Sequence, residues 1–391
     1  LCAGLSDVLA FLNTFSFSEC DIAYLRKALP ECDAAFFAWL GKLDCKGIQI
    51  YALEEGTLCF PRIPLIRVEG PLAVAQLIET PLLNLINYPS LVATNAARLR
   101  VAAGPDKMML EFGLRRAQGP DGAVSASRYS YIGGFNGTSN LLAGKLIGID
   151  VRGTHAHAFI QSYTSFDQIK DRGLQGKDFV AMVLGYQERL GYQSTSNESE
   201  LAAFTAYALA FPDGFMALLD TYDTLQSGVP NFLCVALALD DLGHRAKGCR
   251  LDSGDLSYLS QEVRRMVTEA SQTFQRPFLA ETNIVASNDI NEESLYHLAD
   301  QGHSINTFGV GTNLVTCQSQ PALGCVYKLV SIEGMPRIKL SQATSKITIP
   351  GKKVVYRLVS SDGVPILDMM LLEGEDPPQP NVPILARQVL G

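Results

Sequence analysis

The sequence lacks any uninterrupted apolar run of about 18 residues, the length at which a membrane-spanning helix becomes a candidate. Its longest apolar stretch, from Leu72 to Leu91, is broken by Gln76, Glu79, Asn84 and Asn87. No cationic segment precedes an apolar one at the start of the chain, and nothing there resembles a signal-peptide cleavage site. These absences favour a soluble protein and exclude an integral membrane protein of the helical class.

An excess of basic charge is also missing. The 32 lysines and arginines are outnumbered by 40 acidic residues, so the formal net charge is -8, and both signs are interspersed. The chain therefore has no basic field for wrapping nucleic acid and no polybasic segment for an anionic membrane. The nine cysteines are scattered, and none forms a C-x-x-C pair, which favours reduced thiols in the cytosol over a disulfide framework or a zinc site.

The 391 residues, 47% of them hydrophobic, exceed the size at which one core usually divides, so two domains are expected. Residues 1–112 combine short amphipathic helices, two β-rich runs and one long helix or two helices joined near Pro89. Residues 326–391 contain β-rich runs around Glu333-Gly334 and Asp362-Gly363 turns, which predict a return to the small domain. The chain begins at Leu1, so we expect a truncated N-terminus, and Gly391 is expected not to be the natural end either.

From 113 to 325, short β-rich runs alternate with helical segments such as Leu256 to Phe274. Such alternation predicts parallel strands with crossover helices, and five or more units favour an irregular (β/α) barrel. A doubly wound open sheet is the alternative, because periodicity does not separate the two. In either architecture the ligand site lies at the carboxyl ends of the strands. Candidate strand ends are Gly153-Thr154, Asp220-Thr221, Asp252-Ser253, Ser287-Asn288 and Gly309 to Thr312.

The segment from Lys247 to Asp255 carries the strongest signal for chemistry. With a period of two, Arg250 and Asp252 fall on one face of the strand. A guanidinium can grip a planar carboxylate, and carboxylates can bind ribose hydroxyls or a Mg²⁺-pyrophosphate. The structural alternative is an ion pair that closes the strand, with Asp255 as the N-cap of the next helix. The residues alone weigh these two interpretations about equally.

Two further strand ends are weaker candidates. The backbone N–H groups around Gly311 and Thr312 could cradle a phosphate, although two glycines alone also suit an ordinary turn. Asp220 and Asp223 could steady a cation or a base, although paired aspartates are as often caps or solvated turn residues. Arg115, in a segment with two adjacent arginines, suits a phosphate or pyrophosphate, and a surface ion pair is its alternative.

The segment Gly153 to His157 holds two of the five histidines of the chain. The pair His155 and His157 could ligate a metal in a barrel hydrolase, with Asp252 as a further ligand. Alternatively, the imidazole of His157 could accept a phosphoryl group from ATP, or either histidine could be structural. Metal binding is the less favoured chemistry, because further histidines on later strands are scarce.

Taken together, these segments resemble the nicotinate phosphoribosyltransferase family of the vertebrate-like type. The resemblance runs from near Leu1 to at least Leu372. Its motifs occur in the family's order. They are SLVATNAARLR, GLRRAQGPDG, YSYIGGFNGTSNLLAG, GTHAHAF, LLDTYDT, GVPNFLCVALAL, RLDSGDL, GVGTNLVT and CVYKLV.

The resemblance implies an irregular α/β barrel with a smaller mixed α/β domain from both chain ends, in a cytosolic homodimer. It implies transfer of phosphoribosyl from phosphoribosyl pyrophosphate to nicotinate, the first step of NAD synthesis from nicotinate, with Mg²⁺ or Mn²⁺ as cofactor and ATP as co-substrate. Its implied catalytic residues are His157, which ATP phosphorylates, and Asp220. Thr154 and Arg250 would contact nicotinate. Arg115, Asp252, Gly311 and Thr312 would bind phosphoribosyl pyrophosphate.

One departure concerns the family's N-terminal segment, whose aromatic residue stacks on nicotinate, because that segment lies before Leu1. Two rival functions follow. The sister enzyme that uses nicotinamide shares the barrel, although GLRRAQGPDG and GTHAH favour the acid-specific family. A catalytically silent homologue that binds ligands is the other, and the presence of His157, Arg250 and Thr312 argues against it.

Overall fold

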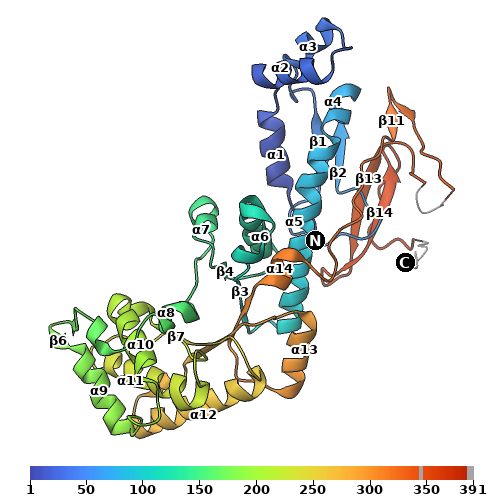
Figure 1. Ribbon diagram of the computed structural model, residues 1–391. Coiled ribbons are helices and arrows are strands. Elements are labelled where there is room, and N and C mark those ends of the chain that lie inside the picture. Colours follow the sequence, from blue (N-terminus) through green and yellow to red (C-terminus); the bar gives the residue numbers. More distant parts are fainter. Residues whose placement is uncertain (343–346, 385–391) are drawn as a thin grey trace. The chain divides into compact units, whose positions relative to one another are not determined.

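The computed structural model describes residues 1–342 and 347–384 of the chain. The chain divides into two compact units (Figure 1). Unit 1 comprises Leu1–Ser90 together with Ala322–Gly391, and unit 2 comprises Leu91–Pro321. Both ends of the chain thus belong to the same unit. The sequence analysis placed domain boundaries at 113 and 326, where the sequence pattern changes. Those boundaries stay a prediction.

The helices at the start of unit 1 form where the sequence predicts them. Ser18 and Asp21 make a reciprocal capping box at the start of the second helix, and the Asp33 carboxylate caps the third. The side chains of Val8, Phe37 and other apolar residues of these helices form a buried cluster. The helices are α1 (Leu5–Thr14), α2 (Glu19–Ala28) and α3 (Ala34–Leu40).

The strands of unit 1 come from both chain ends, as expected, and form antiparallel pairs. Turns at Glu333-Gly334 and Gly363 adopt positive φ, which suits hairpins. The Lys352 ammonium lies 2.9 Å from the Glu69 carboxylate and 2.8 Å from that of Glu373, so it links the two ends of the chain electrostatically. The pairs are β1 (Gln49–Ala52) with β2 (Ile66–Glu69), β11 (Ser331–Ile332) with β12 (Met335–Pro336), and β13 (Lys353–Val359) with β14 (Pro365–Leu372).

The stretch predicted as one long helix, or as two helices joined near Pro89, consists of two helices that are separated at Ile78. It forms α4 (Leu72–Leu77) and α5 (Glu79–Ala103). Pro81 explains the break, because its ring excludes the carbonyl of the residue four positions earlier, while the first turn of a new helix tolerates it. Pro89 lies inside α5, where it leaves the carbonyl of Leu85 without its helical donor. Gly4 packs against that carbonyl so closely that a Cβ would lie 1.9 Å from the oxygen.

Unit 2 is built on a six-stranded parallel sheet whose order is β4-β3-β10-β9-β8-β7. Strands that pair in this sheet also follow one another along the chain. The exception is the pair of β10, the last of these strands, with β3, the first. A barrel requires that pairing, whereas a doubly wound sheet reverses its order at an internal switch point. The strands are β3 (Met108–Glu111), β4 (Gly137–Thr138), β7 (Met216–Leu218), β8 (Gly248–Leu251), β9 (Asn283–Ala286) and β10 (Thr307–Val310).

The segment that follows β4 joins the two edges of this sheet. Val151 forms an isolated parallel bridge with Thr138, at the β4 edge. Four residues later, the Nε2 atom of His155 accepts a hydrogen bond of 3.4 Å from the backbone N–H of Leu218, in β7. In the described residues one bridge and one side-chain hydrogen bond join the edges, with no continuous ladder, so the sheet has the strand order of the predicted irregular barrel without a hydrogen-bonded closure.

Helices connect and cover these strands. Helix α11 is buried along nearly its whole length and packs against both α9 and α10 (Figure 1). Helix α12 spans the residues predicted for it, and the Asp255 carboxylate caps its N-terminus, as the structural interpretation of that residue held. The longer helices of unit 2 are α6 (Gly119–Ile132), α9 (Phe179–Leu190), α10 (Glu198–Ala210), α11 (Val229–Asp240), α12 (Leu256–Phe274) and α13 (Glu292–Gln301).

A π-helical turn, η4 (Thr224–Gly228), follows β7 and packs directly on its end. The α-carbon of Gly228 lies so close to Leu219 that a Cβ there would stand 2.0 Å from the Leu219 carbonyl oxygen. The backbone of Gly228 is itself right-handed helical, with φ of -58°. The requirement for glycine is therefore one of space alone, and it fixes where the chain after β7 can lie.

Gly228→Ala is expected to destabilise the protein by at least about 3 kcal/mol, because the clashing atom is backbone and cannot rotate away. Gly185→Ala is the matched control: this glycine lies inside α9 and has no atom within 4 Å of its would-be Cβ. That change should be neutral or stabilise by about 0.5–1 kcal/mol through helix propensity. Urea unfolding of both variants measures the difference, and equal stabilities would contradict the packing described.

Candidate active site

The candidate residues gather at one edge of the parallel sheet. Arg250 and Asp252 lie at the end of β8, Ser287 follows β9, and Asp220 follows β7 closely. Thr154 and His157 come from the segment that joins the sheet edges and from the start of α8 (His157–Gln161). Since all six strands are parallel, their carboxyl ends share this edge, which is where ligands bind in such folds.

The Arg250 guanidinium is the centre of the cluster. Its Nη1 donates to the Thr154 hydroxyl at 3.1 Å, its Nε to the Ser287 hydroxyl at 2.8 Å, and its Nη2 to Asp252 Oδ1 at 2.9 Å. The guanidinium carbon also lies 5.4 Å from the centre of the Phe112 ring. These contacts come from four separate parts of the chain, so they hold the planar group in one orientation.

A chain of hydrogen bonds leads from Arg250 to Asp220. The Ser287 hydroxyl donates to Asp252 Oδ1 at 2.5 Å, which fixes that carboxylate from a second side. The backbone N–H of Asp252 donates in turn to Asp220 Oδ2 at 3.1 Å, and the Ser253 hydroxyl donates to the same oxygen. One Asp220 oxygen is thus used to tie the end of β7 to the end of β8.

The other oxygen of Asp220 faces His157. Its Oδ1 lies 3.4 Å from His157 Nε2 and has no hydrogen-bond partner within the part of the chain that the structure describes. The Asp220 side chain is 3% exposed, whereas that of His157 is 39% exposed. The buried carboxylate can therefore orient the imidazole, while the ring remains open to a ligand on its other side.

His155 has a structural place instead. Its ring lies among those of Phe159, Phe204 and Tyr207, and it accepts from the N–H of Leu218. Burial lowers the pKa of His155 to about 4, so the imidazole is neutral at physiological pH. Among residues 1–342 and 347–384, no group of three or more His, Cys, Asp or Glu side chains could hold a metal ion. The structure therefore gives no support to the metal-hydrolase alternative.

Gly311 and Thr312 follow β10, which pairs with β3 in the middle of the sheet. A Cβ at Gly309 would lie 2.3 Å from the Phe112 ring, so the glycine makes room for that ring beside the strand end. Phe112 therefore lies between this strand end and Arg250. No direct hydrogen bond between Thr312 and the Arg250 cluster is found in the described residues.

Arg115 lies in the turn η1 (Leu114–Arg116) after β3 and is exposed. No hydrogen bond or ion pair involves its guanidinium in the part of the chain covered by the structure, so it is available to an external anion. The buried carboxylate of Glu111 anchors the start of this turn. It accepts from the Gly113 N–H and, at 2.8 Å, from the Ser127 hydroxyl.

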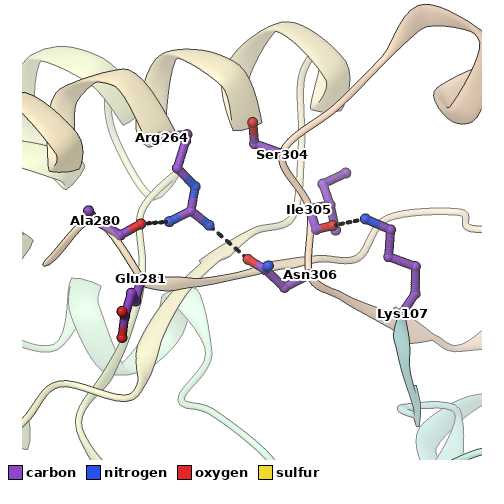
Figure 2. A pocket seen from close by; sticks show the side chains of 7 residues that line it. All are labelled: Lys107, Arg264, Ala280, Glu281, Ser304, Ile305 and Asn306. Carbon is purple, nitrogen blue, oxygen red and sulfur yellow. Dashed lines mark hydrogen bonds between the residues drawn. The ribbon is translucent and has the colours of Figure 1, made fainter. Parts of the chain in front are cut away.

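A polar hollow of about 440 Å³ lies at the opposite, amino edge of the sheet (Figure 2). There Arg264 donates to the carbonyl oxygen of Ala280 at 2.6 Å and to the Asn306 side chain at 2.8 Å. Lys107 donates to the carbonyl oxygen of Ile305 at 2.8 Å. These cations are occupied by groups at the strand starts, so the hollow is best explained as a structural closure of the barrel floor.

Sequence reasoning missed three contributors to the cluster. The sequence analysis gave no role to Phe112 or Glu111, and it named Ser287 only as a strand end. A carboxylate that ends the apolar run Met108 to Leu110 is a signal that could have drawn attention to Glu111. The contact of Phe112 with Arg250 has no such signal, because β3 and β8 are distant in the sequence.

Comparison with known proteins finds relatives that cover most of the chain. Residues 1–87 match the family described as nicotinate phosphoribosyltransferase (NAPRTase) N-terminal domain. The chain is 52% identical to nicotinate phosphoribosyltransferase 1 of Arabidopsis thaliana over 98% of its own length and 71% of the relative's. It is 54% identical to nicotinate phosphoribosyltransferase of Dictyostelium discoideum over 94% of its own length and 63% of the relative's.

The fold agrees as well. The crystal structure of human nicotinic acid phosphoribosyltransferase superposes with a TM-score of 0.87 and 47% identity, covering 97% of this chain and 75% of the human one. Helices long and apolar enough to cross a membrane are absent from the described parts of the chain. The identity and coverage together show that the chain belongs to the nicotinate phosphoribosyltransferase family.

Proposed function

We propose that this protein joins nicotinate to the ribose of phosphoribosyl pyrophosphate, forming nicotinate mononucleotide and pyrophosphate, with ATP hydrolysis coupled through a phosphohistidine. The observation that carries the proposal is the Arg250 guanidinium, held by Thr154, Ser287 and Asp252 at the ligand-binding edge of the sheet. A fixed guanidinium matches the carboxylate of nicotinate, and the Thr154 hydroxyl beside it offers a further polar contact. Nicotinamide carries no charge to satisfy it.

The phosphoribosyl pyrophosphate would extend from this point along the same edge. Gly311 and Thr312 would bind its 5′-phosphate through backbone N–H and hydroxyl groups. The unpaired Arg115 would contact the pyrophosphate. A Mg²⁺ ion usually binds one or two carboxylates together with substrate phosphates. Asp252, whose side chain is 20% exposed, is better placed than the 3% exposed Asp220 to face such an ion.

In the transfer itself, the pyridine nitrogen attacks the ribose C1 while the bond from C1 to pyrophosphate breaks. Positive charge develops on the ribose, and the departing pyrophosphate takes the electron pair of the broken bond. Arg115 and the bound Mg²⁺ would stabilise the leaving group. Arg250 would hold the nicotinate ring in place, so orientation supplies a large part of the rate.

His157 would accept the γ-phosphoryl group of ATP. With its proton on Nε2, the atom that lies 3.4 Å from Asp220 Oδ1, the ring would leave the lone pair of Nδ1 free to attack phosphorus. ADP leaves, and later hydrolysis of the phosphohistidine returns the ring to its starting form. The phosphorylated state would favour the conformation competent for transfer, which is a shift of populations and not a covalent step in the transfer.

We also infer that the protein works as a homodimer in the cytosol. The helix α7 (Leu141–Ile147) presents apolar side chains to the surface, with Leu141 76% and Leu146 62% exposed. A second copy is the partner that would cover such a patch in this family. All nine cysteines are free thiols, which suits a reducing compartment.

The full-length protein, incubated with phosphoribosyl pyrophosphate, Mg²⁺ and nicotinate, is expected to form nicotinate mononucleotide, and ATP should raise the yield. His157→Ala should retain slow transfer but lose the whole effect of ATP, because no other group accepts the phosphoryl. Chromatography of the mononucleotide, with and without ATP, measures both. His297→Ala, at a histidine outside the cluster, is the control and should behave as the unmutated protein.

Product from nicotinamide alone would assign the chain to the sister activity. Product from neither base would leave a ligand-binding homologue as the remaining function. An ATP effect that survives in His157→Ala would contradict the phosphohistidine while leaving the transfer reaction in place.

A further inference from the structure

A carboxylic acid without a cationic partner is buried behind the site. Glu200, in the first turn of α10, is fully shielded from solvent. Its Oε2 accepts from the Ser227 hydroxyl at 2.6 Å and from the Asn231 amide at 2.9 Å. Its Oε1 has no hydrogen-bond partner in the described chain. An unpaired buried acid is costly, so its retention requires an explanation.

Glu200 anchors the segment that begins with Asp220. Ser227 is the fourth residue of the π-helical turn η4, and Asn231 lies one turn later, in α11. Gly228, which follows Ser227, packs against the carbonyl of Leu219. Leu219 is the residue immediately before Asp220. The far end of the segment is thereby fixed to α10 and pressed against the residue that precedes the catalytic carboxylate.

The near end of the same segment is also fixed. The Asp223 carboxylate accepts from the N–H groups of Leu225 and Gln226, at 3.0 and 2.7 Å. The backbone carbonyl oxygen of Asp223 accepts from the N–H groups of Ser227 and Gly228. The turn from Asp220 to Gly228 therefore has little freedom, and π-helical turns of this kind are frequent at functional sites.

We propose that Glu200 is a positioning residue that fixes the Asp220 segment and whose ionised carboxylate adds negative potential behind Asp220, stabilising the positive charge that develops on the ribose. The inference rests on the proposed transfer reaction. It differs from a purely structural role, which the uncharged acid or an amide would fill equally well.

The surroundings of Glu200 explain how its charge responds to pH. The charged groups that act on it are Asp220 and Asp223, while η4 and α11 supply Ser227 and Asn231 but no cation among the described residues. Burial, together with these like charges, raises the pKa of Glu200 to about 7. The carboxylate is therefore mostly neutral at pH 6 and mostly ionised at pH 8.

The raised pKa has opposite consequences for stability and for rate. A carboxyl group whose pKa is higher in the folded than in the unfolded state stabilises the fold at low pH, and this stabilisation is lost as pH rises from about 4.5 to about 7. The proposed gain in rate appears over the upper part of the same range, as the charge forms. The protein would then retain a destabilising charge because the reaction uses it.

The test compares Glu200→Gln with the unmutated full-length protein from pH 6 to pH 8.5. Glutamine can accept both hydrogen bonds at the position of Oε2, so the anchor remains while the charge is lost. The ratio of kcat, unmutated over variant, should rise from near one at pH 6 to about tenfold at pH 8, the size expected of one charge acting over several ångströms of protein. The Tm of the variant should exceed that of the unmutated protein by a margin that grows from pH 6 to a little above pH 7 and then levels off.

Two variants serve as controls. Glu198→Gln removes an exposed carboxylate from the same helical turn, so its kcat and Tm should follow the unmutated protein at every pH. Ser227→Ala removes one anchoring hydrogen bond but keeps the acid. It should lower kcat at every pH while the rise with pH remains.

A kcat ratio that stays flat with pH, in an active unmutated protein, would overturn the inference and leave the proposed function standing. An unmutated protein that forms no nicotinate mononucleotide at any pH would overturn the proposed function, and the inference with it. The opposite trends of rate and Tm in Glu200→Gln, absent from Glu198→Gln, would establish the role.

Discussion

Replacement of Arg250 by alanine is expected to lower kcat/KM for nicotinate by about 10²–10³-fold, which corresponds to roughly 3–4 kcal/mol of lost binding in the transition state. The substrate carboxylate would lose a charge-assisted partner in a partly buried site. Most of the loss should fall on KM, because the carboxylate is distant from the reacting nitrogen and its contact is made before and during the reaction alike. Steady-state kinetics with varied nicotinate measure the effect.

Two controls separate recognition from folding. Arg250→Lys keeps the charge but cannot bond Thr154, Ser287 and Asp252 at once, so it should recover only a small part of the activity. Thermal unfolding of Arg250→Ala shows whether the loss of these contacts disturbs the fold. The same kinetics with nicotinamide give the decisive comparison, because the weak activity toward the uncharged base should change little. An equal loss for both bases would show that Arg250 supports the site without recognising the acid.

The cluster around Arg250 shows which parts of a site can be predicted from sequence. Arg250 and Asp252 were placed on one face because a strand has a period of two, and the structure joins them at 2.9 Å. Helix α12 and its Asp255 cap were also predictable, since helical periodicity and capping are local properties. Such features depend on residues a few positions apart.

Features that depend on distant residues were not predictable. The helical stretch contains both Pro81 and Pro89, and the sequence does not show which of them interrupts it. The helix continues past Pro89, where Gly4, far away in the sequence, packs on the Leu85 carbonyl. The bond from His155 to Leu218 crosses the barrel seam and joins segments 63 residues apart. Glu200 stands in an ordinary helical first turn, and its burial appears only once η4 and α11 are placed against it.

The residues proposed to bind phosphate groups lie apart from the hydrogen-bonded cluster around Arg250. Direct hydrogen bonds join Thr154, Arg250, Asp252 and Asp220, and His157 Nε2 approaches Asp220 Oδ1 to 3.4 Å. Arg115, Gly311 and Thr312 lie after the neighbouring strands β3 and β10, and no hydrogen bond joins them to that cluster in the described residues. Their proposed roles follow from the resemblance to the family and from the strand order.

Asp220→Asn should reduce kcat by about 10²–10³-fold and abolish the effect of ATP, with little change in stability. Asparagine retains an oxygen for the Asp252 N–H and the Ser253 hydroxyl, so the tie between β7 and β8 survives. Its amide then turns donor hydrogens toward His157 Nε2, which favours the tautomer with the proton on Nδ1. The lone pair needed to attack ATP would be blocked, and the negative charge near the ribose would be lost.

A double-mutant cycle distinguishes these two effects. If Asp220 acts on ATP use only by orienting His157, the double variant Asp220→Asn with His157→Ala should use ATP no worse than either single variant. The ATP-independent transfer, by contrast, should fall with Asp220→Asn whether or not His157 is present, because that part depends on the charge beside the ribose. An ATP effect that survives in Asp220→Asn would show that ATP use does not depend on Asp220, and the 3.4 Å approach of the two side chains would then have no part in the coupling.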